Sequence, residues 1–314
     1  MRFIAPFFIT FFLFLLPLPL FAQPLLEASH LATQLTEESI QPIDIRSQEE
    51  YAKGHIPKAI SAPYGLWRGP EDNPGQLAEP EAFEALVQSL GLKPEQHLVV
   101  YSSGDDETDF GAAARVYWTL KYLGFPHISV LNGGFAHWQH NAKHPISTQA
   151  QTLPKSHTKV ELQPELAVDT DTLIRKLQSG AAQYQLLDAR PPAFFQGETK
   201  APTASVPGTI AGAQNIPFSQ WFIPGQTRLR SAVEIRQQVA QQGLDSSAET
   251  LSFCNTGHWA AINWFVLSEI AGVENVRLYP ASLAEWSQHP SALPMDNVPS
   301  RWQQIKNQFK QLVD

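Results

Sequence analysis

The chain has 314 residues, with 22 basic and 30 acidic side chains, a formal net charge of −8 and one cysteine. This length suits two ordinary domains. The acidic balance, without any basic run, argues against nucleic acid or anionic lipid as the main partner, because binding phosphate needs clustered Lys and Arg. A single cysteine excludes an internal disulfide and a metal cluster built on cysteines.

Residues 1–22 have the composition of an export signal. Arg2 is followed by an uncharged stretch rich in Phe, which Pro17 and Pro19 interrupt before a small residue at the predicted cut in front of Gln23. We therefore expect an exported protein, periplasmic in a Gram-negative bacterium, with no stable membrane insertion after cleavage. An uncleaved anchor is the alternative, since the stretch approaches the ~20 residues that span a bilayer.

Beyond the signal, the two halves of the chain repeat one pattern. An Asp-x-Arg strand end occurs at 44–46 and 188–190, and a Gly-x-Ile turn at 54–59 and 208–213. A Gly-Leu helix end occurs at 91–92 and 243–244, and a final Trp at Trp138 and Trp286. Ser102 and Cys254 follow Gly91 and Gly243 at the same distance, so they are predicted to be equivalent. Self-similarity at this long period indicates tandem domains.

We predict an α/β fold in which each domain has a parallel sheet with helices on both faces. Short β-rich runs at 98–101 and 250–253 alternate with helical patterns, which favours this architecture. Residues 145–164 lack apolar periodicity and are rich in Pro, Ser, Thr and Gln, as in a linker. The predicted units are a first domain over 23–144, the linker over 145–164, a second domain over 165–290, and a tail over 291–314 with an amphipathic helix.

Two helices of the second half are indicated by local signals. Ser231 and Glu234 form a capping box before an apolar periodic stretch, and Gly243 suits the position after the last turn. The apolar run at 261–271 predicts a buried helix.

Cys254 ends an apolar strand and opens a short loop that leads into that buried helix. A strand, a tight turn at Gly257 and a helix start place the sulfur over backbone N–H groups at the positive end of a helix. We expect this position to favour a reachable, nucleophilic thiolate. A buried structural cysteine is the alternative, because free Cys packs like a small hydrophobe.

The chain resembles the tandem rhodanese family, sulfurtransferases of the thiosulfate or 3-mercaptopyruvate type. The resemblance covers nearly all of the chain after the signal and rests on the paired Asp-x-Arg ends, the motifs at 54–59 and 131–138, and the Cys-x-x-Gly loop at 254–257. It implies an inactive first domain and a catalytic second one, without cofactor or metal. Cys254 would carry a sulfane sulfur as a persulfide, from a small-molecule donor to a thiol or cyanide acceptor.

The residues after Cys254 are expected to bind the substrate. Their amides would cradle the transferred sulfur; they are Asn255, Thr256, Gly257, His258 and Trp259. His258 could also supply a switchable positive charge, since imidazole titrates near ~6.5, or simply lie exposed at a helix start. Asp188 and Arg190 are expected to brace the loop.

Departures from the family leave the sulfur donor open. Asn255 and Thr256 stand where thiosulfate-type loops carry Arg or Lys, the family's anion-binding Arg falls on Phe194, and only Cys254 and Gly257 match the mercaptopyruvate-type loop. We therefore expect a pocket that is less cationic and more aromatic. Candidate lining residues are Trp259, Trp221 and Phe222, with Arg228 and Arg230 either beside the cleft or on the surface.

In the first domain, Ser102 is followed by a longer loop with four carboxylates between 105 and 109. These would repel anionic donors, so this half is interpreted as structural, shaping one wall of the cleft, or as carrying a solvated acidic loop.

Cys254 could also serve a sulfur-binding or interaction module without turnover, or a thiol redox sensor. A metal site at His137, His140 and His144 lacks a carboxylate at a fitting spacing. Phosphoester hydrolysis is disfavoured because Ala260 stands where that chemistry needs Arg.

Overall fold

A computed structural model describes residues 22–179, 184–245 and 247–303. The predicted signal peptide, apart from Ala22, and residues 304–314 of the predicted tail helix lie outside these ranges. Within the described ranges, no helix combines the length and apolarity needed to cross a bilayer.

The first half folds around a five-stranded parallel sheet with strand order β1-β5-β4-β2-β3. Its strands are β1 Leu25–Leu26, β2 Ile40–Asp44, β3 Ile60–Ser61, β4 His97–Tyr101 and β5 Ile128–Leu131. Its helices are α1 Ala28–Gln34, α2 Gln48–Lys53, η1 Tyr64–Trp67, α3 Pro80–Ser89, α4 Phe110–Tyr122 and α5 Gly134–His140. The predicted strand at 98–101 is β4, whereas the short edge strand β1 was not predicted.

The second half has a four-stranded parallel sheet with order β10-β9-β6-β8. Its strands are β6 Tyr184–Asp188, β8 Gln214–Asn215, β9 Glu249–Phe253 and β10 Val276–Leu278, beside an antiparallel pair of β7 Thr209–Ile210 and β11 Met295–Asp296. Its helices are η2 Pro164–Leu166, α6 Thr170–Ser179, α7 Pro192–Phe195, η3 Phe218–Trp221, α8 Ala232–Gln241, α9 Trp259–Trp264, η4 Phe265–Ala271 and α10 Ser282–Trp286. The parallel sheets were predicted; the antiparallel pair was not.

The local helix signals are confirmed at α8, whereas the helix predicted at 261–271 differs in its hydrogen-bonding pattern. Ser231 Oγ accepts the N–H of Glu234, whose carboxylate accepts the N–H of Ser231, and Gly243 adopts a φ of +67°. The predicted helix at 261–271 is instead the end of α9 followed by the π-helix η4. Apolar periodicity cannot distinguish these two hydrogen-bonding patterns over so short a run.

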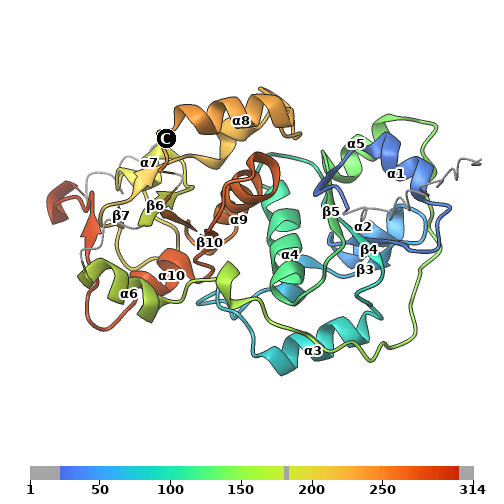
Figure 1. The fold of residues 1–314 in the computed structure, drawn as a ribbon, viewed down its shortest axis with the longest axis horizontal. Helices are drawn as coiled ribbons and strands as arrows, with labels where there is room; N and C mark the ends of the chain where they lie inside the picture. The colour runs from blue at the N-terminus through green and yellow to red at the C-terminus, as the bar shows by residue number, and fades with distance from the viewer. Residues whose placement is uncertain (1–21, 180–183, 246, 304–314) are drawn as a thin grey trace, which may run out of the picture.

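Alternate residues of β4 face two separate cores, as expected of a sheet covered on both faces. Val99 and Tyr101 pack with α1, α2 and α5, while Leu98 and Val100 belong to a cluster that includes α3 and α4. The latter cluster continues into α8, α9 and η4 of the second domain. Helices α4 and α9 lie side by side at the centre of the molecule (Figure 1), so the two domains share one apolar core.

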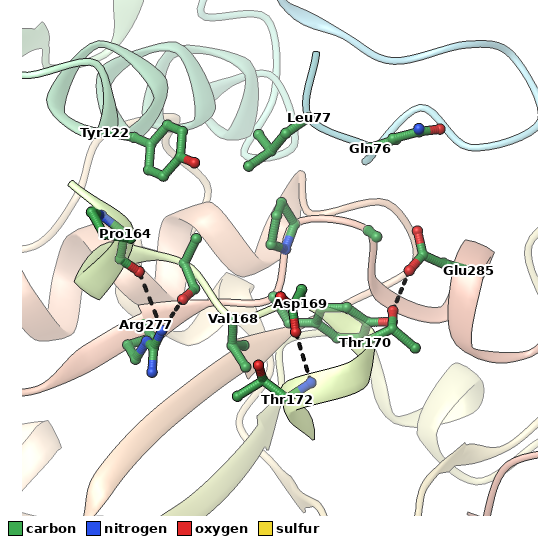
Figure 2. A pocket seen from close by; sticks show the side chains of 14 residues that line it. Gln76, Leu77, Tyr122, Pro164, Val168, Asp169, Thr170, Thr172, Arg277 and Glu285 are labelled. Carbon is green, nitrogen blue, oxygen red and sulfur yellow. Dashed lines mark hydrogen bonds between the residues drawn. The ribbon is translucent and has the colours of Figure 1, made fainter. Parts of the chain in front are cut away.

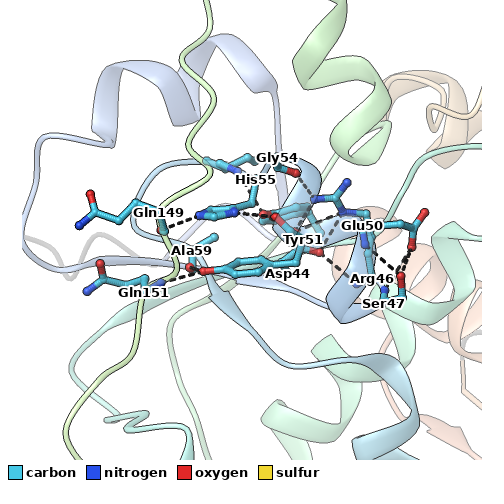
Figure 3. A network of polar contacts seen from close by, with 12 residues as sticks. Asp44, Arg46, Ser47, Glu50, Tyr51, Gly54, His55, Ala59, Gln149 and Gln151 are labelled. Carbon is cyan, nitrogen blue, oxygen red and sulfur yellow. Dashed lines mark hydrogen bonds and ion pairs between the residues drawn. The ribbon is translucent and has the colours of Figure 1, made fainter.

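The predicted linker is attached to the first domain along its course. A bridge joins His55 to Ser147, and the Tyr51 hydroxyl accepts the N–H of Gln151 at 2.9 Å (Figure 3). The His55 ring stacks on Tyr51 with centroids 3.8 Å apart and hydrogen-bonds the Gln149 carbonyl at 3.0 Å. The predicted linker is thus held against the surface of the first domain by these contacts.

Candidate active site

Cys254 and Ser102 occupy equivalent positions, one after each central strand. The Cys254 carbonyl accepts the N–H of Leu283 at 3.2 Å, and the Ser102 carbonyl accepts the N–H of Phe135 at 2.9 Å. Because both contacts join the loop after the central strand to the helix after the next strand, the repeat in the sequence corresponds to a structural repeat.

The Asp-x-Arg pairs are buried at the equivalent ends of β2 and β6. Arg190 reaches the two carboxylate oxygens of Asp188 at 2.9 and 2.6 Å and donates to the Gly208 carbonyl. Asp44 and Arg46 make the same contacts, with Gly54 in place of Gly208 (Figure 3). Arg190 makes one more hydrogen bond, at 3.3 Å to the side-chain oxygen of Asn255. This pair therefore supports the loop after Cys254 from below.

Ser282, at the start of α10, ties the two ends of the cysteine loop together. Its hydroxyl accepts the N–H groups of Cys254 and Gly257, each at 3.1 Å, and donates to the Tyr279 carbonyl at 2.8 Å. Sequence analysis missed this residue. The available signal was that Ser282 lies four residues before Trp286, where the first domain has Gly134 before Trp138.

The loop leaves several backbone donors available. Gly257, which has a φ of +68°, uses its N–H for Ser282, so this amide is not free to bind an anion as predicted. The N–H groups of Asn255, Thr256 and His258 have no acceptor in the described part of the chain. Successive backbone N–H groups without an acceptor are the kind of donor that anion sites in proteins use.

Cys254 is more deeply placed than expected. The residue is 1% exposed and belongs to the apolar cluster shared by the two domains, with Trp259 packed against that cluster. The expectation of a freely reachable sulfur is therefore wrong for this conformation, because the interdomain core covers it.

Two arginines of the first domain grip the back of the cysteine loop. Arg68 donates to the Thr256 carbonyl at 2.8 Å, and Arg115 donates to the Gly257 carbonyl at 3.2 Å. Burial lowers the pKa of Arg115 to about 9, and repulsion from Arg68 adds to this. The surroundings of the loop are thus more cationic than predicted. The missed signal was a lone Arg within the otherwise largely apolar stretch 110–120.

His258 joins the loop to the first domain. Its Nε2 lies 2.8 Å from the Thr108 carbonyl and its Nδ1 lies 2.9 Å from the Tyr64 hydroxyl, so Nε2 donates and Nδ1 accepts. Burial, followed by the charge of Arg68, lowers the pKa of His258 to about 4. The side chain is neutral at pH 7, which overturns both expectations from the sequence, a switchable charge and simple exposure.

Aromatic rings gather where the loop enters α9. Trp259 stacks on Phe218 with centroids 5.1 Å apart and meets the edge of Phe194 at 5.8 Å. The other two aromatic candidates were wrong, because Trp221 and Phe222 are buried in the core. Among the described residues, neither cationic candidate has a hydrogen bond to the loop: Arg228 bonds the Gln226 side chain and Arg230 bonds the Gln220 carbonyl.

A separate cavity of about 290 Å³ lies between the domains (Figure 2), and Pro280 and Ala281 are among the residues that line it. Gln76 and Leu77 line one side, and Thr170 with Glu285 lines the other. It contains no residue of the cysteine loop. The described ranges hold no group of three or more His, Cys, Asp or Glu side chains arranged for a metal, and His144 instead contacts Trp138.

Comparison with known proteins decides the family. The rhodanese-like domain family matches residues 27–141 and 169–289. The chain belongs to the rhodanese-like family. This rhodanese is 30% identical to the 3-mercaptopyruvate sulfurtransferase of Escherichia coli strain K12 over 284 residues, covering 86% of this chain and 97% of the relative. It is also 30% identical to a thiosulfate sulfurtransferase of Azotobacter vinelandii, covering 84% and 94% of the two chains.

Solved structures agree with this assignment. The crystal structure of SseA from Escherichia coli, a 3-mercaptopyruvate sulfotransferase, is 28% identical with a TM-score of 0.71 and covers 84% of this chain and all of its own. The Tum1 protein from Saccharomyces cerevisiae is 25% identical with a TM-score of 0.73, covering 90% of this chain and all of its own. This rhodanese is therefore a sulfurtransferase enzyme.

Proposed function

We propose that the second domain transfers a sulfane sulfur through a persulfide on Cys254, with thiosulfate or 3-mercaptopyruvate as the donor class. Both donors are named for relatives that match this chain at 30% identity. The observation that carries the proposal is the loop after β9, in which the one cysteine of the sequence is followed by three backbone N–H groups that have no acceptor among the described residues. The first domain has serine at the equivalent position.

The proposed chemistry needs one sulfur atom on one residue. The Cys254 thiolate attacks the outer sulfur of thiosulfate, a new S–S bond forms, and sulfite leaves with the electron pair of the broken bond. From 3-mercaptopyruvate, the C–S bond breaks instead, and the thiol proton ends on the carbon of pyruvate. Cyanide or an acceptor thiolate then attacks the outer sulfur and releases the Cys254 thiolate.

The residues around the cysteine supply binding and orientation. The amides of Asn255, Thr256 and His258 would hold the outer, anionic sulfur, while Ser282 fixes the loop ends. Trp259 would form an aromatic side of the substrate site, with Phe194 and Phe218 behind it. A donor with an apolar body is expected to benefit from these rings.

Steady-state release of thiocyanate from cyanide tests this proposal with each donor in turn. We expect turnover with at least one donor and complete loss in Cys254→Ser, because serine cannot carry the sulfur. Loading of sulfur without turnover would instead indicate a sulfur-binding module, and a reversible mixed disulfide without loading would indicate a redox sensor.

We also propose that the protein is exported by cleavage before Gln23. The support is the composition of residues 1–22, which lie almost entirely outside the described ranges. N-terminal sequencing of the protein from its native host should begin at or near Gln23. A chain that keeps its first residues and sediments with membranes would indicate an anchor.

A further inference from the structure

Arg115 is buried and Arg68 is partly buried beside the cysteine loop, and neither side chain has an ionic partner among the described residues. Arg115 is 0% exposed and its Nε has no hydrogen-bond partner, and the Nη1 of Arg68 is buried without one. Neither guanidinium lies within 4.0 Å of a carboxylate in the described ranges. Buried charges are normally paired, because removing an unpaired ion from water is costly. This pair therefore calls for a compensating anion.

Among the described residues near the two arginines, a phenol and a thiol could carry a negative charge. Tyr64 and Cys254 are the two whose negative charge would raise the pKa of Arg115. Burial raises the pKa of Tyr64, and its hydroxyl donates its proton to His258 Nδ1, so this phenol stays neutral. The sulfur of Cys254 is the remaining candidate for the anion.

The hydrogen bonds of the arginines also orient the loop. Because every peptide of the described chain is trans, a carbonyl that points to Arg115 turns the N–H of His258 the opposite way, and that N–H has no acceptor. A carbonyl that accepts from a guanidinium polarises its peptide and strengthens that N–H as a donor. The contact is close: a Cβ on Gly257 would lie 2.3 Å from Arg115 Nη1.

We propose that Arg68 and Arg115 are positioning residues through which the first domain stabilises the anionic sulfur of Cys254. They turn the carbonyls of Thr256 and Gly257 away from the anion site and supply the positive charge that balances a thiolate or persulfide. The first domain thus takes part in sulfur transfer although it lacks a nucleophile. This inference rests on the proposed persulfide chemistry.

The test is the pH dependence of Cys254 reactivity in Arg115→Met and Arg68→Met, measured as the rate of alkylation by iodoacetamide. The titratable or charged side chains that face the loop are Tyr64, His258, Arg68, Arg115 and the Asp188–Arg190 pair, and the charge of Asp106 also acts on His258. Tyr64 and His258 are neutral at pH 7. Removing one arginine should move the plot of alkylation rate against pH by about one to two pH units toward alkaline pH. At pH values well below the midpoint of the profile, the alkylation rate should fall about 10-fold for each pH unit that the profile moves, since there the thiolate fraction changes roughly tenfold per unit.

Three variants make the result specific. Arg115→Lys keeps the charge and should restore most of the profile, whereas a purely structural role predicts no such rescue. Arg236→Met removes an exposed arginine that bonds the Ile270 carbonyl, and it should leave the profile unchanged. Arg68 is only partly buried, so Arg68→Met keeps the test decisive if Arg115→Met does not fold.

An unshifted profile in a folded Arg68→Met or Arg115→Met protein overturns the inference. If the unaltered protein loads sulfur while both variants keep its profile, this inference alone fails. If the unaltered protein loads no sulfur from any donor, the proposed function fails, and the alkylation profile still reports whether the arginines stabilise the thiolate.

Discussion

The loops after β4 and β9 occupy equivalent positions in the two domains, but they differ in what their backbone N–H groups bind. In the first domain, the N–H of Gly104 donates to the Asp109 carboxylate at 2.5 Å, so the loop binds a carboxylate of its own. In the second domain, the loop after Cys254 has no carboxylate, and three of its N–H groups remain available. One scaffold thus binds a carboxylate of its own in the first domain and leaves the corresponding N–H groups of the second domain without one.

This comparison shows how two of the four carboxylates of the acidic loop are bound within it. Asp109 does not face the cleft as a repelling charge, because it is turned into its own loop, and Asp106 accepts the Asp109 N–H at 2.8 Å. Burial raises the pKa of Asp109, which the hydrogen bond from Gly104 opposes. The first domain instead faces the cysteine loop with Arg68, Arg115 and Tyr64.

The largest expected effect comes from moving the cysteine from the loop after β9 to the loop after β4. The double variant Ser102→Cys, Cys254→Ser is expected to gain no sulfur from thiosulfate or 3-mercaptopyruvate, because Asp109 already fills the loop at Ser102. Intact mass after incubation with donor provides the measurement, and the unaltered protein is the positive control. Loading on residue 102 would show that the carboxylate does not close the first site.

The two buried Asp–Arg pairs allow a matched test of stability against function. Asp44→Asn and Asp188→Asn each leave a buried arginine unpaired, so each should lower the free energy of unfolding by about 3–5 kcal/mol. Only Asp188→Asn should also slow sulfur loading in the folded protein, because only Arg190 reaches the cysteine loop through Asn255. Urea unfolding measures the loss of stability, and sulfur loading at low urea concentration measures the loss of function in the folded protein. Equal loss of loading in Asp44→Asn would contradict the assignment.

The smallest expected effect concerns His258, which ties the open loop to the first domain. Its pKa of about 4 lies below the ~6.5 of a free imidazole, so between these values the unfolded chain binds a proton that the folded protein excludes. The contribution of this group to stability is therefore complete above pH ~6.5, is lower by roughly 2 kcal/mol at pH 5, and continues to fall toward pH 4.

His258→Gln provides the control for this prediction. Urea unfolding at pH 7.5, 6 and 5 should show a steeper loss in the unaltered protein than in the variant, because glutamine does not titrate. Parallel losses would mean that the ring is protonated in the folded state, which the bond between Nδ1 and the Tyr64 hydroxyl argues against.

Local and repeated patterns made much of the fold predictable. The capping box at Ser231, the strand at 98–101 and the repeated Asp-x-Arg ends are written in adjacent residues, and each appears where the sequence placed it. The partners of the cysteine loop are not local. Arg115 and Arg68 lie 142 and 188 positions from the loop residues that they bind. Neither composition nor periodicity reports such contacts, since packing between domains decides them.

The depth of Cys254 was unpredictable for the same reason. A loop after a strand suggests exposure, but the shared interdomain core covers the residue. Likewise, Trp221 and Phe222 are candidates for a pocket wall from the sequence alone. In the structure, the Trp221 indole donates to Asn263 and Phe222 meets the edge of Phe110.

The central claim is that Cys254 alone carries the transferred sulfur. Intact mass spectrometry of the protein incubated with thiosulfate or 3-mercaptopyruvate, followed by peptide mapping, tests this directly. The account predicts a gain of one sulfur atom, located on the peptide that contains Cys254, which cyanide removes. No gain with either donor, or sulfur located on any other peptide, would contradict it.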